Sequence, residues 1–231
     1  MGVRGGCFSK TLVRVRPNFT GQLILGRNRG VLPKLFLDHL WPVLTVWSLL
    51  YISDHTLTIW CAHLYRVTAR EKIVYEGSFE LNPVFQREVD ALRWVSFRFV
   101  LALAATNLLL AAVWLTEAQS SNELYSFLLG AFILVQLGIH VRHTKNLFLF
   151  HAMRHADVVR GRIEYSRPLI LRLSAVEFLS LAALYAVLFF FTRSWFVTGG
   201  VFACLLLAGK HWWLARRWAA NRLPQGQDKV S

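Results

Sequence analysis

Five long apolar stretches constrain this chain more than any other feature of its sequence. They cover residues 41–65, 94–116, 124–141, 169–191 and 195–213. A helix that crosses a bilayer needs about 20 apolar residues, and a water-soluble fold rarely contains one such stretch. Only 17% of the residues are charged, whereas soluble domains carry about 25%. The sequence therefore predicts an all-α fold, a polytopic helical bundle in the membrane with about five transmembrane helices.

The polar segments divide the chain into three parts. Residues 1–35 form a basic N-terminal arm that glycines and prolines interrupt, and residues 219–231 form a polar C-terminal tail. Residues 36–218 between them form the transmembrane domain. Within that domain, amphipathic segments near 66–93 and 142–167 are expected on the cytoplasmic side.

The basic residues indicate a lipid partner and an orientation. The net charge is +13, but the lysines and arginines flank the apolar stretches, where anionic lipid headgroups would meet them. We therefore expect the bilayer as the partner, and not nucleic acid. The two amphipathic segments and the C-terminal residues from Lys210 onward hold 16 of the 26 lysines and arginines. The positive-inside rule then predicts a cytoplasmic C-terminus, in what we expect to be a prokaryotic cytoplasmic (inner) membrane.

The number of spans conflicts with the basic N-terminal arm. Five spans place that arm on the side opposite the C-terminus, although it carries seven basic residues. A sixth, re-entrant membrane element near residues 75–92 would remove the conflict. The sequence leaves an odd and an even count open.

Asp54 lies inside the first apolar stretch, where an ionised side chain costs about 2.5–3.5 kcal/mol on insertion scales. At helical spacing it shares a stripe with Thr58, Cys61 and Tyr65, and Trp47 lies on the same line. This polar seam is suited to the interior of a bundle. It is either a proton or ion site at Asp54 or a buried acid that bonds to a neighbouring helix.

Two later apolar stretches also contain polar residues. Asn107 is expected to hydrogen-bond between helices. Glu177 shares a helix face with Ser174, and we expect it to meet Arg98 or a histidine in a structural pair. A functional role for Glu177 is the alternative.

Histidines follow one another on the third span and its continuation. His140, His143, His151 and His155, with Arg154 among them, occupy one stripe of about 120° on a continuous helix. Their spacing is used by metal sites on helices, but no further histidine box or acid at ligand spacing accompanies them. The sequence favours a basic amphipathic helix whose imidazoles and arginines face lipid phosphates. No cofactor is strongly implied, and a metal is the one that this pattern would suggest.

The motif Glu80-Leu81-Asn82-Pro83 interrupts the segment between the first two spans. The residue before a proline avoids the helical conformation. Asn82 can cap a helix in which Pro83 is the first residue. We therefore predict a helix that begins here and continues into the second span.

Together these residues carry a resemblance. Asp54 with Thr58, followed by Glu80-Leu81-Asn82-Pro83, resembles the Asp-x-x-x-Thr and Glu-x-Asn-Pro motifs of an uncharacterised family of small prokaryotic multi-pass membrane proteins. The resemblance covers about residues 45–95. It implies residence in a membrane and carries no activity with it.

Three kinds of function fit these observations, of which a structural protein whose polar residues only pack helices ranks third. The first is a binding or channel-like protein, or a subunit of a homo-oligomer or larger membrane complex, with a polar intramembrane cluster. The alternative is a membrane-embedded, metal-dependent enzyme that acts on a lipid through the histidine stripe. The chain has no nucleophile elbow, no HExxH and no phosphate-binding loop, so the binding function ranks first. The cluster would consist of Asp54, Thr58, Glu80, Asn82 and Glu177.

Overall fold

The computed structural model describes residue 36 and residues 38–117, 122–155 and 160–221. The predicted N-terminal arm, residues 1–35, and most of the predicted tail lie outside the described residues.

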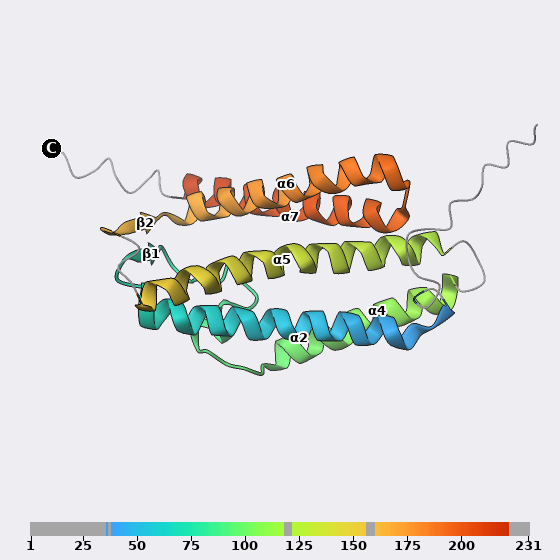
Figure 1. Ribbon diagram of the computed structural model, residues 1–231, viewed down its shortest axis with the longest axis horizontal. Coiled ribbons are helices and arrows are strands. Elements are labelled where there is room, and N and C mark those ends of the chain that lie inside the picture. The colour runs from blue at the N-terminus through green and yellow to red at the C-terminus, as the bar shows by residue number, and fades with distance from the viewer. Residues whose placement is uncertain (1–35, 37, 118–121, 156–159, 222–231) are drawn as a thin grey trace, which may run out of the picture.

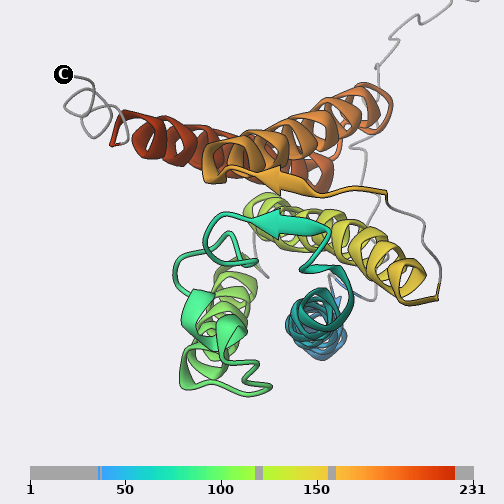
Figure 2. The same ribbon diagram turned by 90° about the vertical axis from the view of Figure 1, so that its left-hand side faces the viewer.

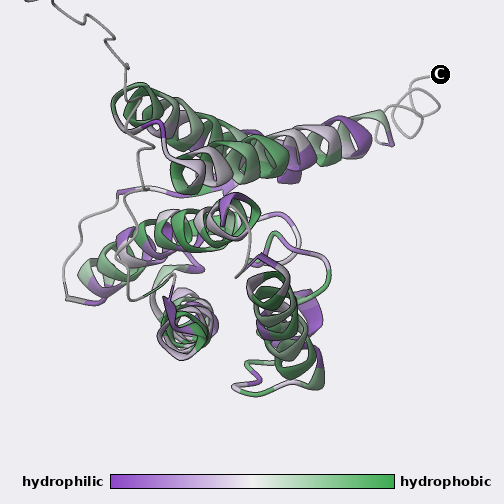
Figure 3. Cartoon of the chain, turned by 90° about the vertical axis from the view of Figure 1, so that its right-hand side faces the viewer, coloured by the Kyte–Doolittle hydropathy of each residue, from purple (hydrophilic) through white to green (hydrophobic). Residues whose placement is uncertain are grey.

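Five long helices run side by side along the long axis of the molecule (Figure 1). Hydrophobic residues predominate along them (Figure 3). A helix that is apolar over most of its surface has to be covered by protein or lipid. The helices are α2 (Leu40–Leu64), α4 (Phe97–Glu117), α5 (Glu123–His155), α6 (Arg167–Thr192) and α7 (Trp195–Ala220).

Four of these helices, α4, α5, α6 and α7, are long and apolar enough to cross a membrane. They confirm the predicted class, a polytopic helical membrane bundle. The fifth predicted span is α2, a helix of 25 residues that lies beside α5 (Figure 1). Asp54 and His55 interrupt its apolar sequence, and it is not among those four. The described residues therefore contain four helices that could cross a membrane and one further long helix, α2, aligned with them.

The two predicted amphipathic segments meet at one end of the bundle (Figures 1 and 2). After α2 the chain forms a π-helical turn, η1 (Tyr65–Ala69), and a short strand, β1 (Ile73–Tyr75). β1 pairs in parallel with β2 (Ile163–Tyr165), with Ile73 opposite Ile163. Sequence analysis missed both strands, because a three-residue strand is too short to show an alternating pattern.

Residues 75–92 lie at this same end of the bundle (Figure 1). They form the end of β1, a loop and the five-residue helix α3 (Gln86–Asp90). The chain ends its last helix, α7, at the same end.

The prediction of one helix from Pro83 into the second span is wrong. Leu92 has a φ of 51°, which interrupts the helical backbone, and α4 begins only at Phe97. Ser96 starts α4, and its Oγ accepts the Phe99 N–H at 3.2 Å. Asn82 uses its Oδ1 to accept the Val84 N–H at 3.3 Å. This is a local Asx turn, which competes with helix formation.

The predicted continuation of the third span is confirmed. α5 is one helix of 33 residues, about 50 Å long at 1.5 Å per residue. The hydrocarbon core of a bilayer is about 30 Å thick. The C-terminal turns of α5 therefore reach the end of the bundle where β1 and β2 lie (Figure 1).

The predicted polar and aromatic seam of α2 faces the interior. Trp47 is buried; it stacks on Phe132 at 4.9 Å between ring centroids and donates from Nε1 to Thr106 Oγ1 at 2.9 Å. Asn107 Nδ2 donates to Ser48 Oγ at 3.1 Å, so its predicted role between helices is confirmed. These contacts attach α2 to α4 and α5.

Glycines allow α5 and α7 to pack with their backbones close together. A Cβ on Gly130 would collide with the Phe196 carbonyl, and a Cβ on Gly199 would collide with the Phe127 carbonyl. Small residues at such contacts let membrane helices approach each other closely. Gly209 lies further along α7, and a Cβ there would meet nothing within 4 Å.

We predict that Gly199→Ala lowers the free energy of unfolding in detergent by about 1–3 kcal/mol, because the added methyl group would push two backbones apart. Gly209→Ala is the matched control. It should leave stability unchanged or raise it by up to about 1 kcal/mol, because alanine favours helix over glycine. Unfolding can be followed by the fluorescence of the nine tryptophans. Equal effects of the two substitutions would contradict the close packing.

Candidate functional site

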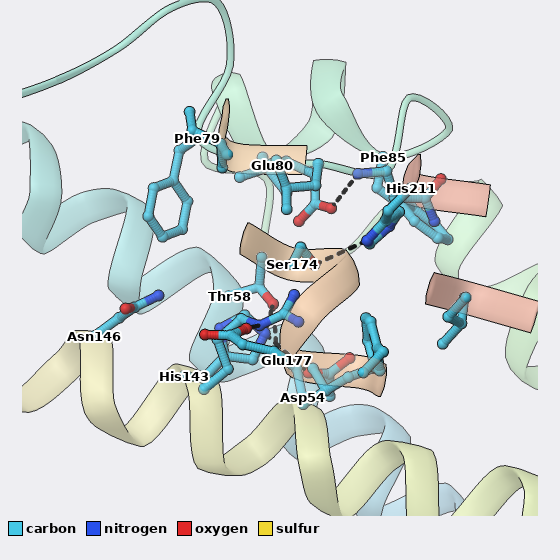
Figure 4. Close-up of a pocket in the computed structure, with 18 of the residues that line it drawn as sticks. Asp54, Thr58, Phe79, Glu80, Phe85, His143, Asn146, Ser174, Glu177 and His211 are labelled. Carbon is cyan, nitrogen blue, oxygen red and sulfur yellow. Dashed lines mark hydrogen bonds and ion pairs between the residues drawn. The ribbon is translucent and has the colours of Figure 1, made fainter. Parts of the chain in front are cut away.

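A cavity of about 560 Å³ lies between α2, α5, α6, α7 and the loop that follows β1 (Figure 4). Its wall combines apolar and aromatic side chains with charged and polar ones. The structure places every member of the predicted polar cluster on this wall, although they come from three separate parts of the chain: Asp54, Thr58, Glu80, Asn82 and Glu177.

Asp54 and Thr58 lie on α2 and meet His143 of α5 (Figure 4). The Thr58 hydroxyl donates to the Asp54 carbonyl at 2.9 Å. His143 Nε2 lies 3.1 Å from Thr58 Oγ1 and 3.2 Å from Asp54 Oδ1. The Thr58 hydroxyl already donates its hydrogen bond to the backbone, and Asp54 presents a carboxylate oxygen that can only accept. This network therefore assigns a proton to His143 Nε2.

This arrangement differs from a nucleophile–base–acid relay. In such a relay the nucleophile and the acid contact opposite nitrogens of the histidine. Here Thr58 and Asp54 both face Nε2, and the Thr58 hydroxyl donates to its own helix. The group therefore orients His143 against Asp54 and Thr58, and it does not activate Thr58.

Glu177 of α6 is held by two cations of α5. Its Oε2 accepts from Arg142 Nε at 2.7 Å, and its Oε1 accepts from Lys145 Nζ at 3.0 Å. The predicted pairing with Arg98 or a histidine is not what the structure shows, because Arg98 lies 3.5 Å from Glu88 instead. Arg98 and Glu88 lie close along the chain, whereas α5 places Arg142 and Lys145 directly beside Glu177.

Glu80 and Asn82 belong to the loop over the cavity. Glu80 Oε1 accepts the Asn82 N–H at 2.6 Å. Burial raises the pKa of Glu80 above its ordinary value, although the Asn82 N–H and the charges of His143 and Arg167 act in the opposite direction. The neutral carboxyl is therefore favoured more strongly than in water.

Arg167 holds this loop in place. Its side chain is 4% exposed, and its guanidinium donates to the Ser78 carbonyl at 2.6 Å and the Glu80 carbonyl at 3.0 Å. Its backbone N–H donates to Glu76 Oε2 at 2.9 Å. Five donors in a rigid fork suit this task, because one guanidinium can satisfy several carbonyls at once.

Sequence reasoning missed several residues of the wall. His211 of α7 is buried and its Nδ1 lies 2.8 Å from Ser174 Oγ. His211 lies within the last apolar stretch, and that position was a signal that could have found it. Arg142, Lys145 and Gln136 also line the cavity, and only the packing of α5 against α6 identifies them.

The histidine stripe divides into different environments. His140 is used structurally, because its ring nitrogens lie 2.7 Å from Ser53 Oγ and 2.7 Å from the Gln136 carbonyl. His143 faces the cavity. His151 and Arg154 are exposed near the end of α5, and the side chain of His155 lies outside the described residues. In the described part of the chain, no three His, Cys, Asp or Glu side chains gather as a metal site would require.

Four polar atoms of the cavity wall are buried and have no hydrogen-bond partner among the described residues. Buried polar groups are hydrogen-bonded in the large majority of cases, and an unmade bond costs about 1–3 kcal/mol. Their concentration on one wall gives the cavity several hydrogen-bonding atoms that the described residues do not use. The atoms are Asp54 Oδ1, His55 Nε2, Gln136 Nε2 and His143 Nδ1.

Comparison with known proteins gave no relative. No family model, no curated protein and no solved structure matches this chain.

We predict that Arg167→Met releases the loop over the cavity, because it removes the donors that satisfy the Ser78 and Glu80 carbonyls. Stability should fall by about 3 kcal/mol, and the amides of residues 76–82 should exchange with deuterium faster. Arg162→Met is the control, since Arg162 makes a solvent-exposed pair with Glu164, which contributes at most about 1 kcal/mol. Unchanged exchange in the Arg167 variant would contradict this role.

We predict that Glu80→Gln is at least as stable as the natural protein at pH 8. A carboxyl whose pKa is raised on folding stabilises the fold below its unfolded pKa of about 4.3. That contribution is lost as the pH rises through the folded pKa. The advantage of the glutamine should therefore shrink as the pH is lowered from 8 to 5 in chemical unfolding experiments. A glutamine variant that is clearly less stable at pH 8 would show that the ionised form is needed, and Glu164→Gln on the exposed strand is the control.

Proposed function

We propose that this chain is a multi-pass membrane protein that binds a small amphiphilic molecule in the cavity between α2, α5, α6 and α7. One observation carries the proposal. Polar residues that lie more than 100 positions apart, Asp54 and Glu177, line one cavity of about 560 Å³ in a bundle of apolar helices. Cavities of about 300–1,000 Å³ are the usual size of small-molecule sites.

The composition of the wall supports an amphiphilic ligand. Apolar and aromatic side chains, among them Phe79, Phe99 and Leu173, would contact a hydrocarbon part. Charged groups such as Lys145 and Lys210 would contact a polar part. Small-molecule sites commonly combine an apolar lining with a few polar groups that fix the orientation of the ligand.

The resemblance to the uncharacterised membrane family is consistent with this proposal. Its first motif contributes Asp54 and Thr58 to the wall, and its second contributes Glu80 and Asn82. A shared binding site would explain why both motifs occur in one chain. We propose that the pair of motifs marks a ligand site in that family.

We also propose that the end of the bundle that holds β1 and β2 faces the cytoplasm of a prokaryotic cell. Both basic segments and the end of α7 lie there (Figure 1). Lysines and arginines are retained on the cytoplasmic side of membrane proteins. The cavity would then lie nearer to the cytoplasmic surface of the membrane.

A membrane-embedded enzyme ranks second. The residues of the histidine stripe do not gather at one place, because His140 bonds to Ser53 whereas His143 faces the cavity. Thr58 donates its proton to its own helix. A binding protein requires neither an activated nucleophile nor a cluster of ligands, so it is the simpler conclusion.

Obstruction of the cavity tests the proposal. Asn146 of α5 is half-buried and lies on the cavity wall (Figure 4). We predict that Asn146→Trp lowers the affinity for dodecyl amphiphiles at least about tenfold, because the indole would occupy their space. Affinity is measured by the rise in melting temperature that a bound ligand produces in neutral nanodiscs.

The matched control is Asn146→Ala, which removes the same amide and leaves the cavity open. It should bind the amphiphiles as the natural protein does. Three headgroups are compared on the same chain: dodecyl phosphate, dodecylphosphocholine and dodecyltrimethylammonium. If Asn146→Trp weakens the binding of none of these three amphiphiles, the proposed function is wrong.

A further inference from the structure

The charged groups on the cavity wall do not balance one another. Glu177 is shared by two cations, Arg142 and Lys145, so that this group carries a net positive charge. Lys210 of α7 also lines the cavity. Among the residues that the structure describes, it has no carboxylate partner. The cavity therefore presents more cationic charge than its paired acids compensate.

The acids on the wall do not remove this excess. Asp54 lies 3.2 Å from His143, and burial of Glu80 favours its neutral form, since its pKa is raised. The guanidinium of Arg167, which holds the loop, donates its hydrogen bonds to the Ser78 and Glu80 carbonyls and not to a carboxylate. The side chain of Lys210 is exposed, so its ammonium group is accessible to an anion that enters the cavity.

The wall also carries hydrogen-bonding atoms that no described residue satisfies. Gln136 is 5% exposed and its Nε2, which can only donate, has no partner among the described residues. His143 is 9% exposed and its Nδ1 is likewise unpartnered. Both residues line the cavity. The wall thus offers an amide donor and an imidazole nitrogen in addition to the ammonium group of Lys210.

Asp54 contributes one feature that selects among anions. Its Oδ1 can only accept a hydrogen bond. His143 Nε2 lies 3.2 Å from it, but Nε2 is hydrogen-bonded with Thr58 Oγ1 and makes no hydrogen bond with this oxygen. A simple carboxylate or sulfate would leave that oxygen unsatisfied. A phosphate monoester in its singly charged form carries anionic oxygens and one P–OH donor, so it can satisfy cations, amide and carboxylate together.

We propose that the cavity binds the phosphate group of an amphiphile, with Lys210 and the Gln136 amide as its binding residues and Asp54 as the acceptor for its P–OH. This inference rests on the proposed function and names the ligand class of that site. The phosphate could come from a lipid headgroup or from free phosphate, since both carry the same group.

The test compares the three dodecyl amphiphiles on a charge variant. Dodecyl phosphate should bind more tightly than dodecylphosphocholine, and dodecyltrimethylammonium should bind most weakly. Lys210→Gln should weaken binding of dodecyl phosphate about tenfold, because it removes one charge-assisted bond. It should leave dodecyltrimethylammonium unchanged or bound more tightly, whereas Lys210→Arg should retain affinity for the phosphate.

Arg216→Gln is the matched control, because Arg216 is an exposed cation of the same helix that does not line the cavity. It removes the same formal charge from the protein and should leave all three affinities unchanged. The inference is overturned if Lys210→Gln and Arg216→Gln have equal effects on dodecyl phosphate. It is also overturned if the trimethylammonium compound binds most tightly.

The outcomes separate this inference from the proposed function. If Asn146→Trp blocks all three amphiphiles but the headgroup makes no difference, the cavity binds an amphiphile and the phosphate assignment is wrong. If dodecyl phosphate binds most tightly, millimolar inorganic phosphate is added to the natural protein with dodecyl phosphate bound. Competition supports recognition of the free anion, and a lack of competition supports a lipid headgroup whose chain is also bound.

Discussion

The cost of charged groups inside an apolar bundle governs how this protein is built. Each acid of the long helices that faces the cavity has a basic residue of another helix beside it: His143 for Asp54, and Arg142 with Lys145 for Glu177. All three basic residues belong to α5. The side chains of Lys145 and Glu177 are 65% and 39% exposed, so water screens that pair, and such pairs contribute at most about 1 kcal/mol. α5 thus contacts α2 and α6 through charge as well as through packing.

Contacts between distant segments close the cavity at one end. The pairing of β1 with β2 brings the segment after α2 beside the segment before α6. Arg167, two residues after β2, then holds the loop that contains Glu80. The loop is thus attached through both a short sheet and a guanidinium, and it presents Glu80 and Asn82 to the same space as Asp54. A site assembled in this way depends on segments that are about 90 residues apart.

The failures of sequence reasoning have a common physical cause. A continuous helix after Pro83 was a sound local prediction, but Asn82 forms an Asx turn and Leu92 takes a positive φ. Glu177 was expected to meet Arg98 or a histidine, and it meets Arg142 and Lys145. A sequence shows which groups need partners, but not which neighbouring helix supplies them.

The sequence by itself determined the class of the protein, the long helices, the uninterrupted length of α5 and the polar residues that need partners, because hydrophobic length and helical periodicity are local properties. It also identified the inward seam of α2, since Trp47 and Thr58 share one helical face. The tertiary structure alone decided that the two motifs, Glu177 and the basic residues of α5 meet at one cavity. It also decided that Gln136 and His143 present unsatisfied atoms there, because such convergence arises only from the packing of helices that are distant in the chain.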